Sequence, residues 1–212
     1  MKLSKKKIKL LFLFLIDIIY PNRCACCDKF ILWDKLCCEN CLKRLKSVEV
    51  DKPSPNVDVC CFYYDDIAID GIVRNKDRNT NFGVYSGMIL GHKLRDVKAD
   101  FVVPVPMYKH KKLYNHAEII AKIISRMNNI PLKTDILYKL DGAPEQHSLK
   151  QAQRSEYLDY FKTNIVNLKG KTIILVDDVV TTGNTMRKCK ELLKQNGAEK
   201  IISVSVTVSK YR

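Results

Sequence analysis

The sequence has no hydrophobic run long enough to cross a bilayer. The longest run, residues 10–16, has seven apolar residues, whereas a membrane-spanning helix needs about 20. A basic start precedes this run, as in a signal peptide, but no small-residue cleavage site follows it. We therefore expect a helix that ends before Pro21 and packs on the next module of a cytoplasmic protein. The same segment would also suit peripheral contact with the inner face of an anionic membrane.

The sequence is also poor in acids and in histidine. Lysine and arginine number 37 against 23 acids, so the net charge is +14 at pH 7. This excess favours phosphorylated or polyanionic partners, without choosing between a nucleotide, a nucleic acid and a membrane. Lysine-rich composition is also common in A/T-rich genomes, with no functional meaning. The four histidines form no metal-ligand or nucleophile–base arrangement: His92, His110, His116 and His147.

Cysteine, in contrast, is abundant. Six of the nine cysteines lie within residues 24–41, where two C-x-x-C knuckles stand ten residues apart. This spacing is typical of a structural zinc site with four thiolate ligands, and a disulfide cluster is disfavoured without secretion. Cys26 and Cys37 lie in the same segment, so the choice of ligands could shift to them. The predicted Zn²⁺ ligands are Cys24, Cys27, Cys38 and Cys41.

Residues 173–185 combine an apolar run, two acids and a polar loop. The four apolar residues 173–176 are typical of a parallel strand buried on both faces. Asp177 and Asp178 would then lie at the carboxyl edge of the sheet, where open α/β sheets bind ligands. Glycine and threonine in the loop favour close approach of a phosphate, which a helix start can also bind. The loop residues are Thr181, Thr182, Gly183, Asn184 and Thr185.

A phosphate on this loop and a diol on the acids describe a site for ribose 5-phosphate. The carboxylates would repel the phosphate, so they are better suited to sugar hydroxyls or to Mg²⁺. The run resembles the phosphoribosyl-pyrophosphate (PRPP) motif of type I phosphoribosyltransferases. A Walker A loop fits less well, because Ile165 stands where its first glycine should be and a strand follows.

The rest of the chain divides at a polar, proline-containing linker, residues 51–58. Residues 1–50 would hold the N-terminal helix and the zinc-binding module, and residues 59–212 the phosphoribosyltransferase-like domain. The expected strands are 59–64, 101–106, one within 130–140, 173–176 and 202–208. The expected helices are 82–94, 115–127 and 185–196, with a short amphipathic piece at 67–73 and a basic loop at 74–78.

Two further loops are candidates for the site. The strand 101–106 runs into a basic loop with Lys109, Lys111 and Lys112, which would neutralise a pyrophosphate. A solvated loop of lysines is also common, so this signal is weak by itself. Residues 141–157 are long enough for a mobile lid, although they also suit a surface loop followed by a polar helix.

The whole pattern is similar to that of the competence protein F (ComF) family. The shared features are a helix ending at proline, the four-cysteine frame, V-P-V-P with its basic loop, and V-D-D-V-x-T-T-G-x-T. The resemblance implies an α/β fold: a type I phosphoribosyltransferase-like parallel sheet flanked by helices, behind a zinc module. It also implies a role in natural transformation, in which single-stranded DNA enters the cytoplasm with the help of DNA-uptake machinery.

The chain departs from the family pattern in its loops. A run of arginine, glycine, aromatic, asparagine and glutamine is here K-L-Y-N-H at 112–116, and the lid threonine is Ala143. We therefore expect binding of PRPP with Mg²⁺, and of single-stranded DNA on aromatic platforms. The candidate platforms are Tyr108, Tyr114 and Tyr157. The alternative is an active Mg²⁺-dependent transferase, with Asp177 and Asp178 as catalytic residues and an unknown nitrogenous acceptor.

Overall fold

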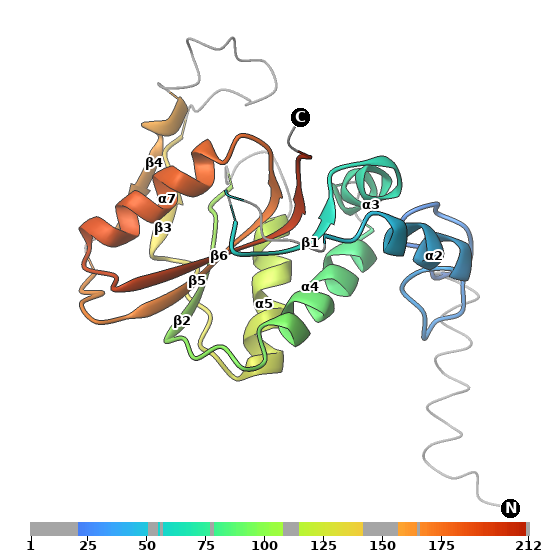
Figure 1. Cartoon of the computed structure of the whole chain (residues 1–212), viewed down its shortest axis with the longest axis horizontal. Helices are drawn as coiled ribbons and strands as arrows, with labels where there is room; N and C mark the ends of the chain where they lie inside the picture. Colours follow the sequence, from blue (N-terminus) through green and yellow to red (C-terminus); the bar gives the residue numbers. More distant parts are fainter. Residues whose placement is uncertain are drawn as a thin grey trace, which may run out of the picture.

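A parallel sheet of four strands forms the centre of the molecule (Figure 1). The computed structural model describes residues 21–50, 55, 57–76, 79–107, 115–141, 157–164 and 166–210. The strand order is β1-β6-β5-β2 and every neighbouring pair is parallel. The strands are β1 (Val59–Tyr63), β2 (Phe101–Pro104), β5 (Thr172–Val180) and β6 (Lys200–Val208). The predicted α/β class with a parallel sheet is confirmed.

Helices cover both faces of this sheet, as Figure 1 shows. One face carries α3 (Asp66–Lys76), α4 (Asn81–Lys93) and α5 (His116–Asn128), and the other carries α7 (Asn184–Gln195). Ile174 and Val176 belong to the core on the α4–α5 side, whereas Ile173 and Leu175 belong to the core on the α7 side. The apolar run of β5 is therefore continuous because successive side chains serve two separate cores.

Strand β5 is longer than the sequence predicted. It continues through Asp177 and Asp178 to Val180, because β6 pairs with it over this whole length. On the other side β2 ends at Pro104, which pairs with Val176. The two acids thus lie inside a strand that extends past its neighbour, and not in a loop after the strand.

Two other predictions differ from the structure in detail. Helix α3 extends to Lys76, so the first half of the basic stretch 74–78 is helical. The strand expected within 130–140 is β3 (Leu137–Lys139), but it lies outside the main sheet. It pairs antiparallel with β4 (Phe161–Thr163), a strand that the sequence pattern did not indicate. The small β3–β4 sheet lies on the α7 side of the molecule.

The cysteine-rich segment packs directly on the central sheet. After α2 (Glu39–Ser47), the chain runs antiparallel to β1: the N–H of Val50 donates to the carbonyl of Cys61, and the N–H of Tyr63 donates to that of Val48. One core continues from the cysteines and Leu45 to the apolar side chains of β1 and α3. The zinc module and the sheet therefore share a hydrophobic core.

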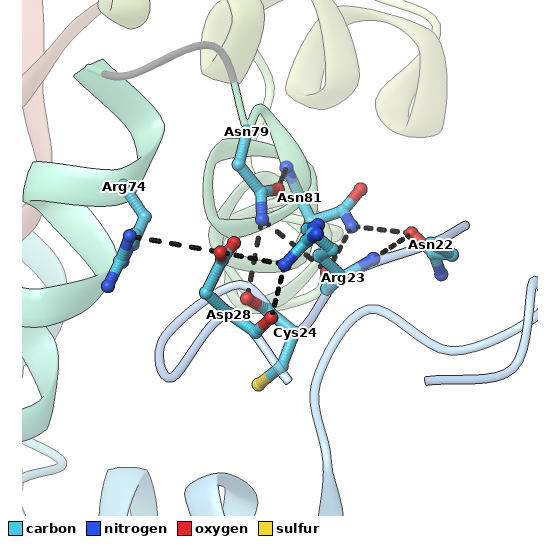
Figure 2. Close-up of polar contacts among 7 residues, drawn as sticks. All are labelled: Asn22, Arg23, Cys24, Asp28, Arg74, Asn79 and Asn81. Carbon is cyan, nitrogen blue, oxygen red and sulfur yellow. Dashed lines mark hydrogen bonds and ion pairs between the residues drawn. The ribbon is translucent and has the colours of Figure 1, made fainter. Parts of the chain in front are cut away.

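Polar contacts also tie this module to the start of α4 (Figure 2). The side-chain amide of Asn81 donates to the carbonyl of Arg23 at 2.8 Å, and that of Asn79 donates to the carbonyl of Cys24 at 3.3 Å. The Arg23 guanidinium in turn binds the carboxylate of Asp28 at 3.1 Å. These contacts fix the first knuckle against α4.

Several predictions lie outside the described residues. They concern the N-terminal helix before Pro21, most of the linker, and residues 142–156 of the expected lid. The boundary between the two proposed domains stays a prediction. Within the described part of the chain, no helix combines the length and hydrophobicity that a membrane span requires.

Candidate functional site

A cavity of about 520 Å³ opens at the carboxyl edge of the central sheet. The ends of β2 and β5, the loop after β5 and the first turns of α5 and α7 surround it. This is the edge at which open α/β sheets bind ligands. The lining includes both acids and the whole predicted phosphate loop: Asp177, Asp178, Thr181, Thr182, Gly183, Asn184 and Thr185.

The loop after β5 presents unused backbone donors to this cavity. Gly183 has a φ of 74° and forms the N-cap of α7, which has no side-chain cap. The first amide of this region with a backbone acceptor is that of Arg187, which donates to the carbonyl of Gly183. Among the described residues, the N–H groups of residues 181–186 have no hydrogen-bond acceptor. This uncapped helix start has the charge and the donors that an anion requires.

The two acids differ in their surroundings, although both remain partly exposed to the cavity. Burial, followed by the negative charge of Asp178, raises the pKa of Asp177 well above its usual range. Lys76, at the end of α3, acts in the opposite direction and also lines the cavity. A cation or a hydroxyl donor placed here would therefore stabilise the ionised form of Asp177.

The wall formed by the β3–β4 sheet is aromatic and carries a partly buried lysine. Tyr157 and Phe161 line the cavity in an edge-to-face pair, with ring centroids 5.7 Å apart. Behind them, Nζ of Lys139 donates to the Tyr157 hydroxyl at 2.7 Å and lies 4.1 Å from the centre of its ring. Burial lowers the pKa of Lys139 to about 8 and raises that of Tyr157 to about 12.

The start of α5 forms another wall of the cavity, and Asn75 of α3 packs behind it. Asn115 caps α5 by accepting the N–H of Ala117, and its amide donates to the carbonyl of Val105. Asn75 accepts the N–H of Gly83 at 3.2 Å, so its amide nitrogen faces Nδ1 of His116 at 3.4 Å. In a neutral ring this network assigns the proton of His116 to Nε2. His116 also lines the cavity.

Sequence reasoning placed only part of this lining. Lys139 and Phe161 were missed, because no motif or period singled them out, whereas Lys76 belongs to the basic stretch 74–78 that the sequence indicates. The sequence predicts Tyr157 as a candidate stacking platform for single-stranded DNA, but its side chain is buried and packs against Phe161. The predicted pyrophosphate contacts Lys109, Lys111 and Lys112 lie outside the described residues, as do Tyr108 and Tyr114.

A second site lies in the N-terminal module. The Sγ atoms of the predicted ligands all lie within 4.8 Å of one another: Cys24, Cys27, Cys38 and Cys41. A tetrahedral zinc site with Zn–S bonds of about 2.3 Å places its sulfurs about 3.8 Å apart. The Sγ atoms of Cys27 and Cys38 are 3.8 Å apart, so the donor set fits the ion. Cys26 and Cys37 are buried and, among the described residues, do not belong to this group.

The surroundings of Cys24 favour the ionised form of its thiol. Burial raises the pKa of this thiol, but hydrogen bonds from the backbone N–H groups of Cys27, Cys38 and Cys26 outweigh burial and lower the pKa to about 6. The N–H of Cys38 lies 3.3 Å from its sulfur. Thiolates are the form that binds metal ions, so the cluster could hold zinc at neutral pH.

Comparison with known proteins agrees with this geometry. The model of the phosphoribosyl transferase domain matches residues 113–210, which include β5, its loop and α7. Competence protein F of Haemophilus influenzae is 29% identical over 116 residues, 52% of this chain and 50% of that protein. DNA utilization protein YhgH of Escherichia coli is 26% identical over 102 residues, 47% of this chain and 45% of that protein. The matches thus span about half the length of these curated relatives.

A solved structure gives a more distant likeness. The purine phosphoribosyltransferase from Pyrococcus horikoshii is 23% identical, with a TM-score of 0.41, over 60% of this chain and 74% of that one. The chain thus carries a match to the phosphoribosyl transferase domain over residues 113–210, and it is similar to competence protein F and to DNA utilization protein YhgH.

Proposed function

We propose that the chain binds a phosphoribosyl ligand such as PRPP, together with Mg²⁺, and serves as an accessory factor in DNA uptake. The observation that carries the ligand proposal is the uncapped start of α7 beside two carboxylates in one cavity. A volume of about 520 Å³ lies within the range of about 300–1,000 Å³ typical of small-molecule sites. The role in DNA uptake is supported by the relatives named competence protein F and DNA utilization protein YhgH.

The phosphate of the ligand would lie on the loop after β5. The amides of residues 181–186 point to no acceptor of the described protein, and each charge-assisted hydrogen bond contributes about 1.5–3 kcal/mol. The hydroxyls of Thr181, Thr182 and Thr185 add donors of the same kind. Gly183 supplies the left-handed backbone that turns the chain into α7.

The ribose and Mg²⁺ would lie beside Asp177 and Asp178. Carboxylate oxygens are ligands that Mg²⁺ accepts, usually with several waters retained. The mutual repulsion of the two acids and the burial of Asp177 make a cation or sugar hydroxyls favourable there. When bound, Mg²⁺ would supply charge neutralisation for the phosphate oxygens of the ligand.

Transfer of ribose 5-phosphate to a nitrogenous acceptor is the second candidate function. One observation favours it: Tyr157 and Phe161 present an aromatic wall to the cavity, which suits a planar ring. In such a reaction the acceptor nitrogen forms a bond to C1 of the ribose while pyrophosphate leaves. Asp177 and Asp178 would orient the ribose hydroxyls as the cationic sugar develops.

Binding of single-stranded DNA is proposed on charge and on exposed aromatic side chains. The net charge of +14 would attract a polyanion, and bases stack on aromatic rings. Phe30 is 65% exposed and Trp33 is 43% exposed. Arg23 lies over the ring of Phe30, 4.4 Å from its centre. These residues, on the first knuckle, take the place of the buried Tyr157 as candidate platforms.

The four-cysteine cluster is proposed to hold structural Zn²⁺. With all four positions taken by thiolates, no coordination site remains open for substrate. The ion would fix the knuckles that carry Phe30 and Trp33.

A paired assay on one zinc-loaded sample tests these proposals. Calorimetry with PRPP and Mg²⁺ should show saturable binding that Asp177→Asn weakens at least tenfold. Release of pyrophosphate, dependent on an added nucleobase, would identify a transferase; binding without release would identify a ligand-binding protein. Absence of PRPP binding in the wild type would sink the phosphoribosyl proposal.

The DNA arm of the assay is independent. Affinity for an unstructured oligonucleotide should fall steeply with salt concentration and survive Asp177→Asn. Phe30→Ala should weaken binding, whereas the equally apolar but distant Leu140→Ala should not. DNA affinity unchanged by salt, or absent, would contradict this part of the proposal.

A further inference from the structure

The last turn of α3 contacts the zinc module on one side and the phosphoribosyl cavity on another. Arg74, Asn75 and Lys76 are consecutive in this turn, so their side chains leave the helix about 100° apart. Arg74 is exposed and reaches Asp28 of the first knuckle, with 3.9 Å between its Nη1 and Oδ2 of the acid. Asn75 is buried, and Lys76 lines the cavity. One turn of helix therefore connects the two candidate sites.

The firmer contact with the knuckle comes from Asn79, because an exposed ion pair contributes little. The backbone N–H of Asn79 donates to the carbonyl of Arg74 at 3.2 Å, and its Oδ1 accepts the N–H of Asn81, the first residue of α4, at 3.1 Å. Its Nδ2 donates to the carbonyls of Cys24 and Arg23, at 3.3 and 3.5 Å (Figure 2). Asn79 thus binds the end of α3, the start of α4 and the knuckle at once.

These contacts reach the predicted zinc ligands. The carbonyl that accepts from Asn79 belongs to Cys24, and Asp28 directly follows Cys27. The N–H of Asp28 also donates to the carbonyl of Cys24 at 3.2 Å, and Asp28 has a φ of 62°, an uncommon backbone conformation outside glycine. A metal ion on Cys24 and Cys27 would hold this turn closed, and with it both contacts to α3.

On the cavity side, the same turn carries a cation toward the two acids. The charge of Lys76 lowers the pKa of Asp177, against the effect of burial, so the ammonium group is close enough to act on that carboxylate. The phosphate groups of a phosphoribosyl ligand would add negative charge beside it. Lys76 would offset this charge, and its effect depends on its position because Coulomb energies fall with distance.

Asn75 anchors the inner side of the turn at one point. Its Oδ1 accepts the N–H of Gly83 at 3.2 Å, and its Nδ2 lies 3.4 Å from Nδ1 of His116. A single anchored side chain leaves the turn free to rotate about it. The knuckle contacts supply a second anchor on the outer side, so they fix the direction in which Lys76 leaves the helix.

We propose that the first zinc knuckle positions Lys76 for the charged groups of the phosphoribosyl ligand, acting through Asn79 and Arg74. This inference rests on the proposed binding of a phosphoribosyl ligand and adds to it a coupling between that ligand and zinc. Asn79 is a positioning residue, whereas Lys76 contacts the ligand. Coupling between two binding sites is reciprocal, so each ligand should tighten the binding of the other by the same factor.

A double-mutant cycle on the zinc-loaded chain tests the path through Lys76. Lys76→Met should weaken binding of PRPP with Mg²⁺, measured by calorimetry, at least about tenfold. Asn79→Ser keeps an oxygen for the N–H of Asn81 but is too short to reach the knuckle, and it should weaken binding about fivefold. The double variant should bind PRPP no worse than Lys76→Met, because Asn79 acts through that lysine.

Asn128→Ser is the matched control. Asn128 also donates to two carbonyls, those of Gly91 and Ile124, but at the other end of α4. This variant should keep the PRPP affinity of the wild type.

The zinc affinity of the wild type, measured against a chromophoric chelator, gives the reciprocal test and needs no variant that must fold. Saturating PRPP with Mg²⁺ should raise this affinity about fivefold. The rise should be lost in Lys76→Met and kept in Asn128→Ser.

Three results would overturn the inference. Additive losses in the double variant would show that Asn79 acts on the fold and not through Lys76. PRPP binding that leaves the zinc affinity of the wild type unchanged would show that the two sites are independent, while the ligand proposal stands. A wild type that does not bind PRPP would remove the ligand proposal and this inference together.

Discussion

The backbone N–H of Asp178 donates a 2.9 Å hydrogen bond to Oδ1 of Asp177. Strand β2 ends before this point, so the carboxylate of Asp177 replaces a neighbouring strand as the acceptor. The carbonyl of Asp178 is held on the other side by the hydroxyl of Thr207, at 3.3 Å. The side chain of Asp177 therefore helps to fix the backbone of Asp178. Substitutions at the two positions should for this reason differ in their effect on stability.

Asp177→Asn should stabilise the free protein at neutral pH while weakening PRPP binding. Burial raises the folded-state pKa of Asp177, so the folded protein binds its proton more tightly than the unfolded chain. This contribution to stability is present near pH 4 and is lost as the pH rises through the folded pKa. Asparagine removes the charge, so its Tm should exceed that of the wild type at pH 7 and match it near pH 4.

The size of this effect is measurable by thermal unfolding. In a chain of this length, 1 kcal/mol shifts Tm by about 2–4 °C. Asp159→Asn, a change at an exposed acid that pairs with Lys188, serves as the control and should leave the pH dependence unchanged. A lower Tm for Asp177→Asn at pH 7 would contradict the desolvation account.

Gly183→Ala should weaken PRPP binding at least tenfold and lower the free energy of unfolding by about 1 kcal/mol, since a left-handed residue with a Cβ is strained. Relief of that strain would turn the amides that face the cavity. Gly197→Ala is a matched control: Gly197 follows α7 with a φ of 94°, away from the cavity. It should lose stability by a similar amount or more and keep PRPP affinity. Equal binding losses in both variants would mean that the loop has no direct role.

The order of the main elements was predictable because it depends on local spacing. Each of the patterns that predicted these elements spans only a few residues. They are the apolar run of β5, the glycine after α7 and the two C-x-x-C knuckles. The extension of β5 through its acids was not predictable, because it depends on pairing with β6, over twenty residues away. In β6, Ser203, Ser205 and Thr207 are fully buried, although alternating hydroxyl residues normally indicate an exposed face.

The aromatic wall of the cavity was missed for a similar reason. Lys139 and Tyr157 lie 18 residues apart and meet only because β3 pairs with β4. Neither three-residue strand is long enough to show a period. Asn75 and His116 are 41 positions apart, and their contact depends on how α3 and α5 pack. Contacts of this kind follow from tertiary structure, so a single sequence carries no signal for them.

Lys139→Met should change how stability depends on pH. Burial lowers the pKa of Lys139 to about 8, so above that pH the folded protein releases this proton while the unfolded chain still holds it. The stability of the wild type should therefore rise, through this group, between pH 8 and about 10.4, the usual lysine value. Methionine keeps the packing on Tyr157 but cannot titrate.

The free energy of unfolding of both proteins is measured by chemical denaturation at pH 7 and at pH 10. Between these two pH values, the free energy of unfolding of the wild type should rise by roughly 1–2 kcal/mol relative to that of Lys139→Met. Lys162→Met, a change at an exposed lysine of β4, should show no such gain. A constant difference between wild type and Lys139→Met would show that the ammonium group is well solvated.

Cys27→Ser should remove zinc and loosen more of the protein than the knuckles. Cys27 is partly exposed, so the change itself leaves little empty volume, but it deletes one of four thiolates. The cysteine cluster shares its core with β1 and α3, so loss of the ion should speed amide exchange in both. Cys26→Ala, by contrast, should retain one zinc ion per chain, because Cys26 lies outside the four-sulfur group. Zinc loss in Cys26→Ala with retention in Cys27→Ser, measured by elemental analysis, would show that Cys26 is the true ligand.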